Sequence, residues 1–169
     1  YERSRSADNL QRMEEGFPTW VRTARHLLKH DFMLYKNTQV TYFPDGESFF
    51  ADLITRLEKA EHFIFLEYFI LAEGKLWDQV FAVLRDRVSR GVEVKILFDD
   101  FGNITRMRRE TIDTMKQCGM DVIIFNPVHQ YVNRLYFNYR DHRKICCIDG
   151  DFAYTGGIKN AHEYANLLH

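Results

Sequence analysis

The feature that most constrains the fold of this chain is a regular alternation of extended and helical segments between residues 39 and 125. Apolar residues at 3.6-residue spacing predict helices over 49–57, 76–90 and 106–118, and short apolar runs predict strands over 39–43, 62–70, 92–98 and 121–125. Successive strand and helix cycles are typical of an α/β domain. We therefore expect a mixed, largely parallel sheet flanked by helices.

Two further segments complete this outline. The pair Asp149-Gly150 separates two short apolar runs, 143–148 and 152–155, which predicts a β-hairpin. Near the N-terminus, Pro18 to His30 has the periodicity of an amphipathic helix with a basic face. Such a helix either packs on its own domain with a solvated side or docks on anionic lipid headgroups, and the sequence leaves both open.

Composition excludes several classes of protein. The chain is 46% hydrophobic and 28% charged, which is typical of a globular domain, and its formal net charge of -1 provides no overall field for nucleic acid. The most apolar stretch, Phe63 to Ala72, is too short to span a bilayer. Three cysteines in no metal-binding spacing suggest reduced, buried side chains.

Because the chain starts without methionine and stops within a predicted helix, we expect it to be part of a longer protein.

The most informative motif begins directly before the first predicted hairpin strand. Its pattern is H-x-K-x4-D-x6-G-G, formed by His142, Lys144, Asp149 and Gly156-Gly157. At typical residue frequencies a chance match has a probability on the order of 1 in 10,000. On an extended strand His142 and Lys144 project from the same face, because side chains alternate with a period of two.

The chemistry of this pair points to an anion. Burying two potentially cationic groups side by side costs several kcal/mol unless an anion joins them, and a bound phosphate would supply one. Gly156-Gly157 lies between a strand and a predicted helix, where backbone N–H groups can approach a phosphate. These residues together predict a phosphate-binding site.

The motif resembles the signature of the phospholipase D superfamily, and its surroundings are similar to the first catalytic half of bacterial cardiolipin synthases. Similar segments occur in the same order over about residues 39–163, among them Phe65-Leu66-Glu67-Tyr68-Phe69-Ile70, Asp99-Asp100-Phe101-Gly102, Phe125-Asn126-Pro127 and Asn138-Tyr139-Arg140. The resemblance implies a phospholipase D-like domain over 37–169, truncated after its first H-x-K motif, preceded by a helical, membrane-proximal segment over 1–36.

The resemblance also implies a mechanism. In this superfamily a histidine from each of two halves meets at one metal-independent site that needs no cofactor; one histidine attacks phosphorus to form a phosphohistidine and the other acts as general acid and base. Carried over, His142 is the nucleophile or the acid/base, and Lys144 binds phosphate. Asp149 belongs to the catalytic motif, although its position at the hairpin turn favours a role in organising the backbone.

Residues after the glycines depart from the family pattern. The usual continuation is G-G-x-N, whereas here Lys159 holds the position of the asparagine and Asn160 follows one residue late. The resemblance therefore implies that Lys159 or Asn160 contributes to phosphate binding with Gly156 and Gly157. We expect Glu163 to orient the catalytic imidazole, or else to be a solvated helix residue.

The function implied is phosphatidyl transfer between two phosphatidylglycerol molecules, giving cardiolipin and glycerol. The expected partners are this anionic phospholipid, a membrane surface and a second H-x-K half from the parent chain or an identical chain, without nucleic acid. The resemblance places the parent protein at the bacterial cell membrane and implies a soluble fragment with little activity of its own. Two alternatives remain: a homodimeric endonuclease and an inactive module that binds anionic lipid.

Overall fold

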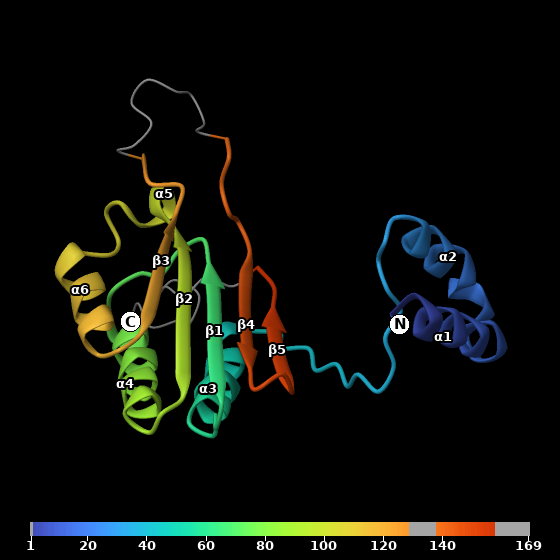
Figure 1. The fold of residues 1–169 in the computed structure, drawn as a ribbon, viewed down its shortest axis with the longest axis horizontal. Coiled ribbons are helices and arrows are strands. Elements are labelled where there is room, and N and C mark those ends of the chain that lie inside the picture. Colours follow the sequence, from blue (N-terminus) through green and yellow to red (C-terminus); the bar gives the residue numbers. More distant parts are fainter. Residues whose placement is uncertain (1, 129–137, 158–169) are drawn as a thin grey trace. The chain divides into compact units, whose positions relative to one another are not determined.

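A computed structural model of the protein describes residues 2–128 and 138–157, which divide into two compact units, one up to Tyr42 and one from Phe43 onward (Figure 1). The first unit contains α1 (Glu2–Gly16), a 3-10 turn (Pro18–Trp20) and α2 (Val21–Lys29). Within residues 2–128 and 138–157, no helix combines the length and the apolar character needed to cross a membrane.

The predicted N-terminal helix is shorter than its apolar periodicity indicated. Pro18 opens a 3-10 turn, so the α-helix starts only at Val21, and Phe17 and Trp20 lie outside it with most of their surface exposed. Ala24 is the buried residue of α2. The basic face of α2 lines a surface hollow of about 510 Å³ with Val21, Arg22, Arg25, His26 and Lys29.

The second unit is built on a five-stranded mixed sheet. The strand order is β3-β2-β1-β4-β5, with bounds β1 Phe63–Tyr68, β2 Glu93–Asp99, β3 Asp121–Phe125, β4 Lys144–Ile148 and β5 Phe152–Thr155. Strands β1, β2 and β3 are parallel, whereas β4 runs antiparallel to β1 and pairs with β5 in a hairpin. The expected fold class, a mixed and largely parallel sheet flanked by helices, is confirmed.

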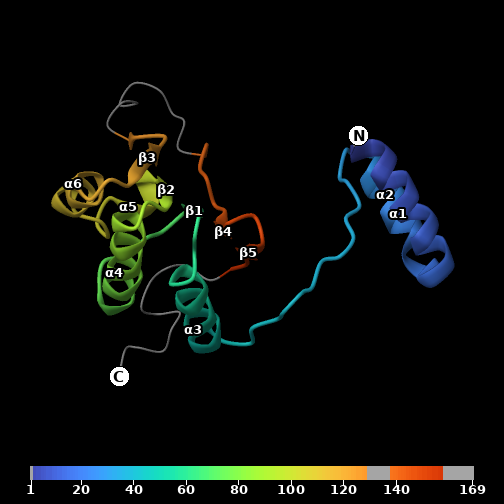
Figure 2. The same ribbon diagram turned by 60° about the horizontal axis from the view of Figure 1, so that its bottom comes forward.

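The helices of this unit are α3 (Gly46–Leu57), α4 (Lys75–Ser89), the short α5 (Asp100–Asn103) and α6 (Arg109–Gln117). Figure 2 shows α3 and α4 on one face of the sheet, with α6 beside β3. Alternate residues of β1 and β2 face these helices and are buried: Ile64, Leu66, Tyr68, Val94, Ile96 and Phe98. Period-two burial of apolar residues against apolar helix faces fixes the register of the sheet.

The prediction of a strand over residues 39–43 is wrong. The structure assigns no strand to these residues, and Val40 and Tyr42 are each 85% exposed. The alternation of Val40, Tyr42 and the polar residues between them therefore faces no core, and such a pattern specifies a strand only where one side is buried. Helix α3 begins directly afterwards, capped by Asp45, whose carboxylate accepts the Ser48 backbone N–H at 2.8 Å.

The topology brings several chain segments to one edge of the sheet. Because β1, β2 and β3 are parallel, the residues that follow them all lie at the carboxyl edge. Strand β4 runs in the opposite direction, so it begins at this same edge, with Lys144 opposite Tyr68. Ligand sites of open α/β sheets lie preferentially at the carboxyl ends of parallel strands, and the H-x-K motif enters the sheet there.

Candidate active site

His142 and Lys144 come together over the aromatic ring of Phe69, which directly follows β1. His142 is exposed just before β4, and its imidazole meets the Phe69 ring edge-on with 4.7 Å between ring centroids. Lys144, the first residue of β4, is only 7% exposed; its Nζ lies 5.6 Å from the Phe69 ring centroid and donates to the His142 carbonyl oxygen. An accessible imidazole thus lies beside a largely buried ammonium group, and both contact the Phe69 ring.

The two glycines of the motif lie at the same edge. Thr155 pairs with Ile145, so Gly156 follows at the level of Lys144 in the antiparallel register. A Cβ atom added to Gly156 or Gly157 would meet no atom within 4 Å, so there is open space beside both. The other predicted site residues, Lys159, Asn160 and Glu163, lie outside the described residues, and their roles stay predictions.

Asp149 lies at the opposite end of β4. It is five residues beyond Lys144, and at a strand rise of about 3.4 Å per residue it is about 17 Å away. Its carboxylate accepts the backbone N–H groups of Glu61, His62 and Phe63, each at 2.8 Å. Asp149 and Gly150 have positive φ angles of 55° and 80°, as the two central residues of a type I′ turn require, and the Asp151 backbone N–H donates to the Ile148 carbonyl oxygen at 3.1 Å. This placement favours the backbone-organising role over contact with a substrate.

The hydrogen bonds at this turn determine the charge of Asp149. Partial burial alone would raise the pKa of its carboxyl group, but the backbone N–H groups of Glu61, Phe63 and His62 stabilise the anion and together hold the pKa below the ordinary value of 3.8. The carboxylate is therefore ionised at neutral pH, where it ties the start of β1 to the hairpin.

On the other side of the strand from Lys144, two carboxyl groups share one arginine. The Arg143 Nε lies 2.9 Å from Glu67 Oε1 and 3.2 Å from Asp141 Oδ1. Burial, followed by hydrogen bonding and repulsion from Asp141, raises the pKa of Glu67, and the charge of Arg143 opposes this shift only in part. The segment around His142 therefore has His142 and Lys144 on one side and Arg143 with its two carboxyl partners on the other.

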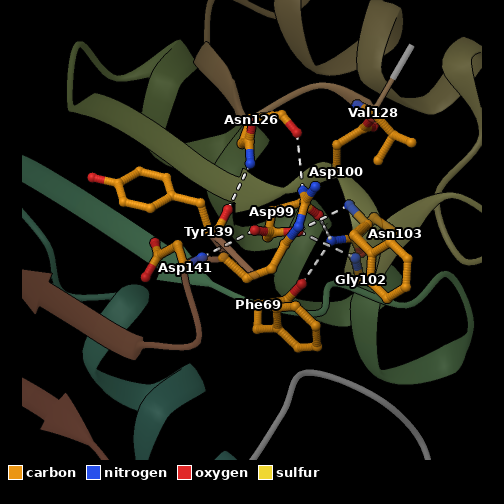
Figure 3. Close-up of polar contacts among 11 residues, drawn as sticks. Phe69, Asp99, Asp100, Gly102, Asn103, Asn126, Val128, Tyr139 and Asp141 are labelled. Atoms are coloured by element: carbon orange, nitrogen blue, oxygen red, sulfur yellow. Dashed lines mark hydrogen bonds and ion pairs between the residues drawn. The ribbon is translucent and has the colours of Figure 1, made fainter. Parts of the chain in front are cut away.

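The carboxyl edge of the sheet also holds polar residues to which the sequence motif assigns no role. Figure 3 shows Asp99, Asn103 and Asn126, which end or follow β2 and β3, turned toward Phe69, Tyr139 and Asp141. Asp99 is fully buried and Asn103 is 3% exposed. The available signal was positional: polar residues stand at the ends of apolar strands that share one sheet edge.

A family model described as "Cardiolipin synthase, PLD-like domain" matches residues 53–165, about two thirds of the sequence and all of the sheet. The chain belongs to this family. The match includes His142 and Lys144 together with the predicted phosphate-binding and imidazole-orienting residues.

Curated relatives agree with this membership. The chain is 36% identical over 141 residues to a cardiolipin synthase of Oceanobacillus iheyensis and 39% identical over 124 residues to one of Clostridium perfringens, which covers 83% and 73% of this chain. It is also 40% identical over 160 residues, 94% of the chain, to an uncharacterized protein of Streptococcus mutans. The chain spans only 29%, 25% and 34% of these three relatives, respectively.

Two solved structures share the fold. NucT from Helicobacter pylori superposes with a TM-score of 0.54 at 14% identity, over 71% of this chain and 72% of that one. Nuc from Salmonella typhimurium, described as a phospholipase D family member, gives a TM-score of 0.50 at 20% identity, over 75% of this chain and 74% of that one. At these identities the likeness concerns the arrangement of sheet and helices.

Proposed function

We propose that this chain supplies one H-x-K half of an active site that transfers a phosphatidyl group between two phosphatidylglycerol molecules. The observation that carries the proposal is the pairing of exposed His142 with largely buried Lys144 over Phe69, at an open edge next to two glycines. Membership in the cardiolipin synthase family supports the choice of substrate. The second half would come from the parent chain or from an identical chain.

The reaction proceeds in two displacements at phosphorus. A neutral imidazole of one half attacks the phosphorus of phosphatidylglycerol; the bond from phosphorus to the headgroup glycerol breaks, and the histidine of the other half protonates the departing glycerol oxygen. That second histidine then takes the proton from a headgroup hydroxyl of another phosphatidylglycerol, whose oxygen attacks phosphorus. The nitrogen–phosphorus bond breaks, cardiolipin leaves and the imidazole is restored. His142 can fill either histidine role.

Lys144 contributes charge to both steps. Its ammonium group is held between the Phe69 ring and the His142 carbonyl, so it needs little reorganisation to face the non-bridging phosphate oxygens. Fixed positive charge at the developing anionic phosphorus centre and correct positioning provide most of the catalysis that phosphoryl-type transfer requires. The open backbone at Gly156 and Gly157 gives the phosphate room to approach.

The test is a hybrid synthase in which residues 53–165 replace the corresponding segment of the Clostridium perfringens cardiolipin synthase. With phosphatidylglycerol micelles, we expect this protein to form cardiolipin and glycerol in equal amounts, measured by mass spectrometry. His142→Ala should abolish both products. His62→Ala is the matched control, because His62 is an exposed histidine before β1, where its backbone N–H donates to Asp149 and its backbone carbonyl accepts from Glu93 at the end of the sheet away from His142.

The second candidate function is an endonuclease formed by two identical chains. It is favoured by the single H-x-K motif in 169 residues, and the net charge of -1 weighs against it. Plasmid nicking by the 169-residue chain, lost in His142→Ala, would replace the lipid proposal with this one. Binding to anionic liposomes that persists in His142→Ala, without turnover by the hybrid, would instead indicate an inactive lipid-binding module.

A further inference from the structure

We propose that Asp99 is a positioning residue that fixes His142 for catalysis by holding the backbone on both sides of it. The proposal deepens the proposed function, because it concerns the histidine at the centre of that site. Asp99 is the last residue of β2, 43 positions before His142, and is fully buried. Its side chain has no route to a substrate except through the segments it binds.

The first contact lies on the N-terminal side of His142. Asp99 Oδ2 accepts the backbone N–H of Asp141 at 3.0 Å, directly before the catalytic histidine. Asp99 Oδ1 accepts the backbone N–H of Phe101 at 2.9 Å and that of Gly102 at 3.4 Å, so the carboxylate is itself held by the start of α5. One buried carboxylate thus joins the end of β2 to the chain that enters β4.

The second contact reaches His142 through Asn103 and Phe69. The Asn103 amide donates to the Asp99 carbonyl oxygen at 2.8 Å and to the Phe69 carbonyl oxygen at 2.9 Å, and it accepts the Leu71 backbone N–H at 2.8 Å (Figure 3). The Phe69 backbone N–H in turn donates to the carbonyl oxygen of Arg143. Phe69 is therefore fixed on both sides of its Cα atom, and its ring is the surface on which His142 rests.

A third contact is an ion pair between Arg140 and the Asp99 carboxylate. Arg140 Nη1 lies 3.3 Å from Asp99 Oδ1 and donates to the Asn126 carbonyl oxygen at 3.0 Å, and the Asn126 amide donates to the Tyr139 carbonyl oxygen at 2.6 Å. A buried ion pair is weak evidence for stability, because removing both charges from water offsets much of their attraction. Its clear effect here is geometric: two residues before His142, the chain is locked to the ends of β2 and β3.

These contacts explain how an exposed imidazole can have a defined position. His142 is exposed, but the residues on either side of it and the ring beneath it are all held by the ends of parallel strands. Misplacement of a reacting group by about 1 Å can cost about 100-fold in rate. Loss of the Asp99 carboxylate should therefore change the position of His142 before it changes the fold of the sheet.

The experiment follows the His142 imidazole by NMR in the 169-residue chain with ¹³C-labelled histidine, the signal being assigned by its absence in His142→Ala. The ring current of Phe69 displaces this signal, and Phe69→Leu shows where it lies without that ring. We expect Asp99→Asn, which is nearly isosteric but places an amide donor against a backbone N–H, to move the signal most of the way to the Phe69→Leu position. Asp86→Asn is the matched control, because Asp86 also pairs with arginines but lies on the exposed side of α4.

An unmoved His142 signal in folded Asp99→Asn would overturn the proposal. If Asp99→Asn does not fold, Arg140→Met decides, since it keeps a long unbranched chain but removes the Nη1 group that contacts both Asp99 and the Asn126 carbonyl oxygen; a moved signal supports positioning and an unmoved one overturns it. In the hybrid synthase, Asp99→Asn should lower kcat by about 10- to 100-fold with KM changed by less than about twofold. A hybrid without any activity would defeat the proposed function, while the NMR comparison would still decide the positioning role.

Discussion

The two ends of β4 use the same device for different purposes. At each end an aspartate accepts three backbone N–H groups: Asp149 from Glu61, His62 and Phe63 at the start of β1, and Asp99 from Phe101, Gly102 and Asp141. Asp149 holds an exposed hairpin turn closed. Asp99 is fully buried and holds the segment that carries His142.

The comparison indicates that the motif residues have different roles at the two ends of one strand. His142 and Lys144 begin the strand at the carboxyl edge of the sheet, while the aspartate of the same motif fixes the far end, about 17 Å away by strand rise. Disturbing the Asp149 end should cost stability and leave chemistry intact. Disturbing the other end should alter chemistry, with a stability cost that depends on the residue.

The largest difference between the effect on activity and the effect on stability is expected for Lys144→Met. Removing the ammonium group should lower phosphatidyl transfer by the hybrid synthase by about 100- to 1,000-fold, because a fixed charge at the phosphate is lost. Stability should stay the same or rise, since replacing a largely buried cation with an apolar chain of similar size removes a desolvation cost. Initial rates with phosphatidylglycerol and urea unfolding curves measure the two quantities, and a strongly destabilised but active protein would contradict the division.

Glycine substitutions at the two ends come next. A Cβ atom on Gly102 would lie 2.1 Å from the Phe69 carbonyl oxygen, so Gly102→Ala must displace Phe69 or α5 and should cost about 2 to 4 kcal/mol. Gly150→Ala meets no atom closer than 3.9 Å and suffers only the strain of a φ of 80°, about 1 to 2 kcal/mol. Chemical denaturation of both variants tests the order. Only Gly102→Ala should also move the His142 NMR signal.

At the hairpin end, Asp149→Ala should lower the free energy of unfolding by about 1 to 3 kcal/mol, because three backbone N–H groups lose their acceptor. Asp149→Asn should cost less, since asparagine keeps one acceptor oxygen and tolerates the positive φ. Urea midpoints compare the two variants. Equal destabilisation would show that the hydrogen bonds of the carboxylate contribute little to stability.

The smallest effect is a pH dependence at the same residue. Asp149 has a lowered pKa in the folded protein, so its contribution is present above its unfolded value of about 3.8 and is lost as the pH falls through the lower folded value. The stability difference between the wild type and Asp149→Ala should therefore be constant from pH 7 to pH 5 and shrink below about pH 4. A difference that grows on acidification would contradict the direction of the shift.

Much of the second unit could be predicted from the sequence because its signals are local. The span of β3 was predicted residue for residue, and β1, β2 and β4 were predicted within one or two residues at each end, because buried apolar runs flanked by turn residues leave few alternatives. Where no core was available the same reasoning failed, as at Val40 and Tyr42. Apolar periodicity predicts a strand only where a second element buries the apolar side chains.

The site was predictable only where its chemistry is local. His142 and Lys144 are two residues apart, so their shared position follows from strand geometry. The contacts of Asp99 with Asp141, and of Phe69 with His142, join residues more than 40 positions apart and depend on which strands become neighbours. The short helix α5, which begins at Asp100 and contains Asn103, was not predicted because four residues carry no periodicity.

The most direct test of the account is the rate of cardiolipin formation per folded molecule in the hybrid synthase, compared between His142→Ala and Asp149→Asn. We predict a loss of at least about 1,000-fold for His142→Ala, because no other group replaces the missing imidazole, and a rate within about twofold of the unmodified hybrid for Asp149→Asn. Cardiolipin formation that survives in His142→Ala, or that disappears in folded Asp149→Asn, would contradict the assignment of chemistry to one end of β4 and of folding to the other.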